Sequence, residues 1–549
     1  MTGASSSEGM VTSLHHLASD AGARVLSQGG NAVDAAVATC LALNVVLPEM
    51  CGIGGEGRAL ILTARGESVV VDWGARSPLQ ASEDMYRLDH GRGRVVLSPS
   101  IPLTGWPAVK DNANAFGYRS VMVPGAVAGY AECLKRFGTM SLERLIEPAI
   151  RLAGEGFEVT PELARHIGEN ADLLSRFPGS RRVFLEEGLR RHWDIDGPHL
   201  RLVQSDLADT LRLIGKEGPG AFYRGEIAAA IEGAMRENGG LITREDLAAY
   251  RPEILKPSRG TFGEFGVLGM PGGGTTVVQI LNLLGEIGLE GAGPESAEVL
   301  HLLAEAVRLT FGDRIKYIFG DLEKVPWRGL CSRDYARELA GQVDRRRAAP
   351  VDTPVRADPW VYERDTTHLC VVDAERNVVS ATITLGAAFG SRVVIPGTGI
   401  LMNGLMASLN PEPGDINSVG PWKRRRSPHA GTIVTRDGAP YLAAGSPGGE
   451  KQIVATAQVL LNVLLGGRSV QEAIDMPRLF RGLRDAVYVS ETMPEGTIGQ
   501  LKARGHRVEK KLARDFGFGR PNGILIDPAG SRELEGGVHG ESNGKASGI

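Results

Sequence analysis

The sequence predicts a folded protein of the mixed α/β (α+β) class. Hydrophobic residues make up 42% and charged residues 23% of the 549 positions, so the chain can bury a large core and wholesale disorder is excluded. Helical and strand-like hydrophobic patterns both occur along its length. The 73 glycines and 30 prolines together stay below the share found in low-complexity chains, which places the glycines in turns and close backbone contacts.

The first two thirds of the chain read as mostly helical. A buried, alanine-rich helix is expected over residues 31–46, opened by the turn Gly29-Gly30-Asn31. Residues 59–63 and 68–72 alternate like a hairpin around Arg65-Gly66. Further helices are expected at residues 126–137, 149–153, 207–216, 227–237, 277–284 and 301–311.

The pattern changes after an exposed, charged and proline-interrupted connection over residues 342–364. Strands are then expected at residues 366–373, 378–384, 431–435 and 440–444. The glycine- and serine-rich tail, residues 532–549, is expected to be frayed.

Charge and cysteine usage exclude several classes of function. The 61 basic and 65 acidic residues give a net charge of −4, so no basic field exists to hold nucleic acid or an anionic membrane. The five cysteines show neither CxxC nor Cys/His metal spacing, which predicts free core thiols, no disulfide framework and no metal site. No cofactor is expected. We therefore expect no nucleic acid or membrane partner.

The start of the sequence carries no targeting signal. Residues 1–9 are small and polar and lack the basic and apolar regions of a signal peptide. The most apolar early stretch, residues 35–47, is too short to span a bilayer. These features predict a cytoplasmic location.

Thr366 is the residue with the strongest chemical signal. It would begin a strand directly after an exposed connection, within Asp365-Thr366-Thr367-His368. If the chain is cut before Thr366, the new α-amine can act as general base for the residue's own hydroxyl and create a self-contained nucleophile. Taken alone, the pattern also fits an ordinary half-buried strand threonine.

Several motifs, in their order along the chain, indicate that Thr366 is more than an ordinary strand threonine. They are QGGNAVDAA (28–36), GIGGEG (52–57), VPG (123–125), DTTH (365–368), PGTGI (396–400) and GSPGG (445–449). With these motifs the chain resembles the γ-glutamyltransferase (γ-glutamyl transpeptidase) family of N-terminal-nucleophile (Ntn) hydrolases over nearly its whole length, as an atypical member. The resemblance implies the Ntn-hydrolase αββα four-layer sandwich.

The resemblance also implies an autocleaved precursor. Cleavage between Asp365 and Thr366 would give a large segment, 1–365, and a small segment, 366–549, which together form one Ntn-hydrolase fold. The two segments would stay associated as a heterodimer, and further oligomerisation is left open. Thr366 would then attack the carbonyl of a small-molecule substrate and form an acyl-enzyme. Water would hydrolyse this ester, or an amine would accept the acyl group.

The implied catalytic residues are Thr366, Thr384, Gly448 and Gly449. Thr384 matches the family's threonine that hydrogen-bonds the nucleophile. Gly448 and Gly449 match its oxyanion-hole glycines, whose N–H groups can approach a developing oxyanion closely because no Cβ intervenes. The same GSPGG sequence also fits a simple tight turn.

The chain departs from the family where a γ-glutamyl group is usually held. The carboxylate-binding arginine position is Gly74, the ammonium-binding aspartate position is Ser408, and neighbouring polar positions are Gly386 and Leu405. A buried ammonium without its carboxylate would be costly, so these losses predict an acyl pocket that is not tuned for glutamate. The candidate substrate contacts are Arg76, Asn403, Ser408 and Ser427, with the charge run 423–426 as a further candidate partner of a substrate carboxylate.

Four functions remain open from the sequence. The leading hypothesis is an autoprocessing threonine hydrolase or acyltransferase with a non-standard substrate. Its setting would be specialised, antibiotic-type metabolism, with C–C bond hydrolysis of an oxalyl-type group among the expected reactions. The alternatives are a cephalosporin-acylase-like amidohydrolase, an ordinary γ-glutamyltransferase or glutathione hydrolase, and a homologue that does not mature and only binds.

Overall fold

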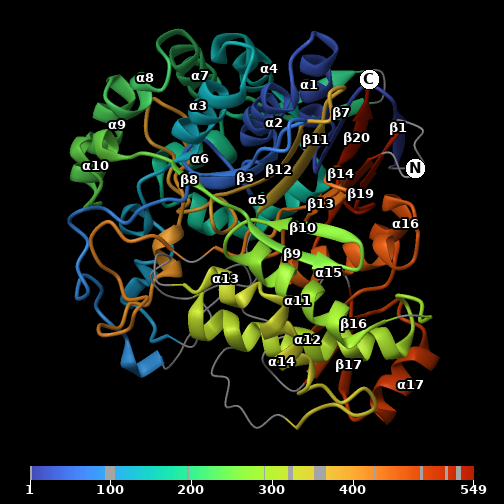
Figure 1. The fold of residues 1–549 in the computed structure, drawn as a ribbon. Helices are drawn as coiled ribbons and strands as arrows, with labels where there is room; N and C mark the ends of the chain where they lie inside the picture. The colour runs from blue at the N-terminus through green and yellow to red at the C-terminus, as the bar shows by residue number, and fades with distance from the viewer. Residues whose placement is uncertain are drawn as a thin grey trace.

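A computed structural model describes most of the chain (Figure 1). The described residues are 3–92, 106–194, 197–289, 291–318, 325–350, 366–425, 427–481, 486–512, 517–526 and 533–549. Asp365, Arg426 and residues 351–364 of the predicted connection lie outside them.

Two seven-stranded antiparallel sheets form the centre of the molecule. Sheet I has the order β20 (Lys545–Gly548), β2 (Met10–Ser13), β11 (Thr367–Val372), β12 (Val378–Thr384), β3 (Glu56–Leu62), β4 (Ser68–Asp72), β8 (Glu253–Leu255). Sheet II has the order β1 (Ala4–Ser6), β19 (Leu534–Val538), β18 (Asn522–Ile526), β14 (Ala439–Gly445), β13 (Thr432–Arg436), β10 (Phe265–Gly269), β9 (Ser258–Phe262).

Helices cover the outer faces of both sheets. α1 (His16–Ser27) and α2 (Ala32–Val46) pack beside sheet I, where α2 contacts β11 and β12. α11 (Gly273–Ile287), α12 (Ala297–Tyr317) and α15 (Lys451–Leu464) lie on the side of sheet II, as Figure 1 shows below the strands. Since β11 and β12 also contact β14, the two sheets face each other. The predicted αββα four-layer sandwich is confirmed.

Both predicted segments contribute to each sheet. Sheet I combines β2, β3, β4 and β8 from the part before residue 365 with β11, β12 and β20 from the part after it. Sheet II combines β1, β9 and β10 with β13, β14, β18 and β19 in the same way. Neither segment can therefore bury either sheet alone, and the division at residue 365 remains a prediction that fits one shared core.

The predicted helices and strands are confirmed, and several helices are longer than predicted. The strand predicted to begin at Thr366 begins at Thr367. Asn31 and Asp34 form a capping box at the start of α2: Asn31 Oδ1 accepts from Asp34 N at 3.0 Å, and Asp34 Oδ2 accepts from Asn31 N at 3.0 Å.

The further helices are α3 (Ala126–Phe137), α4 (Leu142–Glu155), α5 (Pro161–Leu174), α6 (Pro178–Phe184), α7 (Ser205–Glu217), α8 (Gly220–Tyr223), α9 (Glu226–Glu237), α10 (Arg244–Ala249), α13 (Trp327–Leu330), α14 (Arg333–Ala340), α16 (Val470–Asp475) and α17 (Glu495–Ala503). Two small sheets join β5 (Phe157–Glu158), β7 (Gly197–Leu202) and β6 (Leu189–Asp194), and β15 (Leu479–Arg481), β16 (Ala486–Ser490) and β17 (Arg507–Lys511).

The prediction of a frayed C-terminal tail is wrong. Residues 534–538 form β19 inside sheet II, and residues 545–548 form β20 at the edge of sheet I. The glycines there allow close packing, because a Cβ at Gly536 would lie 2.7 Å from Ala546 Cβ. The C-terminal residues therefore contribute one strand to each sheet.

Two further expectations concern cysteines and membranes. All five cysteines lie in the described part of the chain, and each is a buried free thiol, as predicted. Burial raises the pKa of the Cys331 thiol to about 12. Among the described residues, no helix combines the length and apolar character needed to cross a bilayer.

Candidate active site

Thr366 and Thr384 lie side by side at one end of sheet I. Thr367 pairs with Ile383 in the antiparallel β11–β12 ladder. Thr366, directly before Thr367, therefore lies opposite Thr384, directly after Ile383. A hydrogen bond joins the two side-chain hydroxyls, whose oxygens are 3.4 Å apart. The N–H of Gly386 donates to Thr384 Oγ1 at 2.8 Å, which fixes that hydroxyl. Both threonines are buried, and Asp365 lies outside the described residues.

The Gly448-Gly449 turn connects β14 to α15 with positive φ angles of 124° and 58°. The carbonyl of Gly448 accepts from Lys451 N at 3.1 Å, and the carbonyl of Pro447 accepts from Ser446 Oγ at 2.7 Å. Because the C=O and N–H of a trans peptide point in opposite directions, the N–H groups of Gly449 and Gly448 point away from these partners. Neither N–H donates to any described residue. The turn therefore holds two oriented donors that are free to bind an anion.

Packing between the two sheets brings this turn toward the Thr366 end of sheet I. A Cβ at Gly445, the last residue of β14, would lie 2.3 Å from the ring of His368. Only glycine permits this approach, and His368 stands two residues after Thr366. The start of β11 and the end of β14 thus meet at one edge of the sandwich.

A row of polar side chains crosses the inner face of sheet I next to the two threonines. The strand register places His368 opposite Thr382, Thr382 opposite Arg58, Arg58 opposite Asp72, and Asp72 opposite Glu253. Directly opposite residues point to the same face of a sheet. This polar row faces sheet II, whereas the alternate residues of β11 pack against α2.

His368 is an uncharged member of this row. Its Nδ1 lies 2.8 Å from Thr382 Oγ1, and its Nε2 lies 3.3 Å from Ser380 Oγ and 3.4 Å from Cys370 Sγ. Burial lowers the pKa of His368 to about 3. The ring is therefore neutral at pH 7, and its contacts with Thr382 and Ser380 join β11 to the neighbouring β12.

We expect His368 to make the fold acid-sensitive. Its pKa is lower in the folded chain than the unfolded value near 6.5, so the unfolded chain binds the extra proton below that pH and stability falls between pH 6.5 and 3. From pH 6.5 to 5 this residue should account for about 2 kcal/mol. Urea unfolding of the uncut Thr366→Ala protein, with and without the additional change His368→Gln, measures this contribution. Parallel stability curves from pH 7 to 5 would contradict the assignment.

The far end of the polar row is a buried ion cluster. The carboxylate of Asp72 lies 2.8 Å from Arg58 Nε and 2.8 Å from Arg424 Nη1. Burial would raise the pKa of Asp72, but Arg424 and then Arg58 outweigh it and lower that pKa. Arg424 Nη1 also lies 3.2 Å from Glu253. Its Nε and Nη2 are buried and make no hydrogen bond in the described structure.

Arg76 and Arg425 extend this cluster. Arg76 pairs with Glu253 and donates to the carbonyl of Trp422 at 3.1 Å. Burial, and next the nearby Arg424, lower the pKa of Arg76. Arg425 pairs with Glu56, and both of these side chains are buried. The predicted substrate contact Arg76 thus lies beside the charge run 423–425, but its guanidinium already has protein partners.

Comparisons with known proteins identify the family to which the chain belongs. A family model described as Gamma-glutamyltranspeptidase matches residues 18–549. The chain belongs to the γ-glutamyltransferase family of Ntn hydrolases. The members of this family are acyltransferases and hydrolases, and this chain is an enzyme of that class.

Three relatives illustrate its place in the γ-glutamyltransferase family. The chain is 37% identical to the acylase ACY 1 proenzyme of Pseudomonas sp. (strain SE83) over 532 residues, 96% of this chain and 91% of that protein. It is 35% identical to the glutathione hydrolase proenzyme of Escherichia coli (strain K12) over 542 residues, 95% of this chain and 89% of that protein. Among solved structures, cephalosporin acylase from Bacillus halodurans superposes with a TM-score of 0.86 and 29% identity, covering 100% of this chain and 97% of that one.

The remaining predicted substrate contacts occupy different environments. Asn403 donates to the carbonyls of Gly54 and Met122, each at 2.8 Å, and accepts from Met122 N at 3.0 Å and from Leu405 N at 3.3 Å. Its side chain therefore joins backbone loops. Ser408 ends the short 3-10 helix Leu405–Ser408 and is buried.

Ser427 is the fourth predicted contact. Its hydroxyl accepts from His429 N at 3.2 Å, and its carbonyl accepts from Arg314 at 3.3 Å. Arg314 and Glu450 form a buried ion pair beside it, which the sequence did not suggest. The roles of the four predicted contacts stay predictions.

Two departures from the γ-glutamyltransferase pattern are physically linked. Gly386 has a φ of 100°, and a Cβ there would lie 2.6 Å from Leu405 Cδ2. The leucine therefore occupies the space that a side chain at position 386 would need. Leu405 belongs to an apolar cluster with Ala75, Met122 and Leu409. An apolar wall thus stands where two polar positions would be expected.

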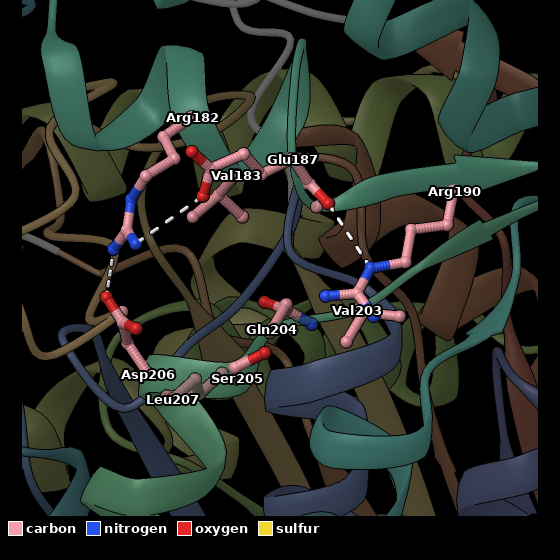
Figure 2. A pocket seen from close by; sticks show the side chains of 11 residues that line it. Arg182, Val183, Glu187, Arg190, Val203, Gln204, Ser205, Asp206 and Leu207 are labelled. Atoms are coloured by element: carbon pink, nitrogen blue, oxygen red, sulfur yellow. Dashed lines mark hydrogen bonds and ion pairs between the residues drawn. The ribbon is translucent and has the colours of Figure 1, made fainter.

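A pocket between α6 and α7 lies outside this region (Figure 2). Arg182 pairs there with Asp206 and, at 3.8 Å, with Glu187, and Arg190 donates to the Glu187 carbonyl. None of the predicted catalytic residues lines it. Its charged groups largely satisfy one another, so this pocket contributes nothing to the candidate active site.

Proposed function

We propose that this protein is an autoprocessing threonine acylase that works through an acyl-enzyme on Thr366. One observation carries this proposal: the Thr366–Thr384 hydroxyl pair and the two unpartnered N–H groups of Gly448 and Gly449 meet at one edge of the sandwich. A nucleophile beside oriented anion-binding donors is the arrangement that acyl transfer requires.

Maturation would begin with attack of Thr366 Oγ on the carbonyl carbon of Asp365. The peptide nitrogen takes the proton and becomes the free α-amine of Thr366, and water then opens the resulting ester. The products are segments 1–365 and 366–549, held together as a heterodimer by the two shared sheets. The names of the Pseudomonas and Escherichia coli relatives as proenzymes support such a step.

In the mature enzyme the α-amine takes the proton from Thr366 Oγ as this oxygen attacks the substrate carbonyl. The oxyanion that forms is held by the N–H groups of Gly448 and Gly449, and Thr384 orients the attacking oxygen. The proton passes to the leaving amine when the carbonyl re-forms. Water then hydrolyses the Thr366 ester, or an amine accepts the acyl group.

The acyl group should lack an α-amine. The wall made by Gly386 and Leu405 offers no acceptor for an ammonium group, and Ser408 carries no charge. Burying an ammonium against such a wall would cost on the order of 1–3 kcal/mol or more, because its hydrogen bonds to water are not replaced. We therefore infer that a γ-glutamyl group is a poor substrate.

A carboxylate at the far end of the acyl group would meet Arg424. A Cβ at Gly74 would lie 3.0 Å from Asp72 Oδ1, 3.8 Å from Glu56 Oε2 and 4.0 Å from the guanidinium carbon of Arg424. Arg424 therefore lies near the position that corresponds to the carboxylate-binding arginine of the family pattern, together with the two carboxylates. Its Nε and Nη2 have no described partner, and donors of this kind suit a carboxylate. Together with the similarity to acylases, this favours a dicarboxylic acyl group.

Two anilides that differ only in the α-amine test this substrate class. We expect glutaryl-p-nitroanilide to be hydrolysed with a kcat/KM at least about 10-fold above that of γ-glutamyl-p-nitroanilide, from the cost of an unpaired ammonium. Release of nitroaniline measures both rates on one enzyme preparation. Faster turnover of the γ-glutamyl compound would instead identify an ordinary γ-glutamyltransferase or glutathione hydrolase.

A second candidate reaction uses the same nucleophile. The narrow apolar wall at Gly386 also fits a short acyl unit, such as an oxalyl-type group released by C–C bond hydrolysis in specialised, antibiotic-type metabolism. A processed enzyme that leaves both anilides intact but hydrolyses an oxalyl-type ketone would favour this reaction over amide hydrolysis.

A further inference from the structure

The Gly448-Gly449 turn is anchored from outside its own segment. Glu450 follows the turn directly and is the N-cap residue of α15. Its carboxylate is bound by Arg314 of α12, with Nε at 2.7 Å from one oxygen and Nη2 at 3.1 Å from the other. The Arg314 side chain is 1% exposed and that of Glu450 is 11% exposed. Such a two-point contact fixes direction as well as distance.

The same guanidinium reaches a second loop of the site. Arg314 Nη2 donates to the Ser427 carbonyl at 3.3 Å, and Gln452 Nε2 donates to the Gly449 carbonyl at 2.7 Å. Gln452 Oε1 also accepts from Ala430 N at 3.2 Å. The glycine turn and the 427–430 loop are therefore joined twice, once through Arg314 and once through Gln452.

Arg314 itself stands on a well-supported helix. Its neighbour Asp313 accepts from Gln279 of α11 at 3.0 Å and from the Tyr335 hydroxyl of α14 at 2.8 Å. All three helices precede residue 365, whereas the turn and the 427–430 loop follow it. The ion pair thus crosses the proposed boundary between the segments.

We propose that Arg314 is a positioning residue that sets the Gly448 and Gly449 donors through Glu450. The turn in the small segment then has its catalytic geometry only while α12 of the large segment is docked. This inference rests on the proposed function, since it takes these two N–H groups as the oxyanion donors. A displacement of about 1 Å in such a group can slow a reaction about 100-fold.

The same helix offers a matched control. Glu305 of α12 pairs with Arg481 of β15, and both side chains are almost fully buried. This pair also joins the two segments, but it lies nine residues, or about 13 Å, away along the helix from Arg314. Glu305→Gln therefore removes a buried ion pair of the same kind without touching the turn.

The test measures acetylation of Thr366 by 4-nitrophenyl acetate, a small activated ester that needs no acyl pocket. Thr366 Oγ forms an ester with the acetyl group, the ester C–O bond breaks, and 4-nitrophenolate leaves. We expect Arg314→Ala and Glu450→Gln to lower the saturating rate about 10- to 100-fold. The half-saturating ester concentration should stay within about twofold, and Glu305→Gln should keep the wild-type rate.

The outcomes separate the two proposals. The positioning role is overturned if Arg314→Ala, Glu450→Gln and Glu305→Gln react at equal rates, each measured well below its melting temperature. The assignment of Thr366 as the nucleophile would then still stand. A wild-type rate no higher than that of Thr366→Ala overturns the proposed function and this inference with it. If Arg314→Ala is not cut, Glu450→Gln, which keeps the side-chain volume, carries the comparison.

Discussion

Thr366→Ala is expected to remain a single chain of 58.4 kDa and to lose acylase activity by a factor on the order of 10⁴ or more. In the proposed mechanism a single oxygen, Thr366 Oγ, attacks Asp365 during maturation and the substrate afterwards, and the substitution removes it. It also removes the 3.4 Å contact with Thr384. A denaturing gel and an intact mass spectrum measure the cleavage, and ester or anilide hydrolysis measures the activity.

Thr366→Ser is the matched control for this experiment. Serine keeps the hydroxyl and loses only a methyl group, so cleavage before residue 366 should persist at a lower rate. A wild-type protein that stays whole, like the alanine variant, would point to the remaining alternative, a homologue that does not mature. Cleavage at another bond would move the nucleophile and with it the boundary between the two segments.

Local patterns were sufficient to predict much of the fold. Residues 378–384 alternate and contain β-branched side chains, and they form β12 with the predicted bounds. Residues 126–137 form α3, again as predicted. Both elements are specified by their own hydrophobic periodicity, which a single sequence displays directly.

The ion cluster at the end of sheet I could not be predicted in the same way. Asp72 and Arg424 are 352 positions apart, and their contact joins β4 of sheet I to a loop from the part of the chain after residue 365. A weak local signal did exist, because Glu56 and Arg58 are charged residues two positions apart directly before the apolar run 59–62, and in β3 both are buried. An inward charge in a strand indicates a buried partner without naming it.

The error at the C-terminus has a similar cause. Gly536 and Gly544 raise the glycine content of the tail, and this content indicates flexibility when only composition is considered. In the folded chain each of them lies against other backbone or side chains, with ideal Cβ positions 2.7 Å from Ala546 and 2.4 Å from Val538. Glycine here serves close strand packing, which only the tertiary structure shows.

Gly448→Ala is expected to lower kcat by about 10²–10³-fold, the usual effect of losing one oxyanion donor. At a φ of 124° an alanine is strained, so the backbone has to rotate and the adjacent N–H turns from its present direction. The new Cβ would also approach Gly519 Cα at 3.3 Å. KM should change little, because the donors act on the anion that forms during the reaction.

Gly438→Ala separates lost catalysis from lost stability. Gly438 lies in the exposed turn between β13 and β14, has a φ of 81°, and has open space where a Cβ would stand. Alanine there introduces a comparable backbone strain, about 1–2 kcal/mol, at the opposite end of β14. If both variants melt at similar temperatures and only Gly448→Ala loses kcat, the turn at 448–449 acts on the transition state. Equal loss of kcat in the two variants would assign the effect to the fold instead.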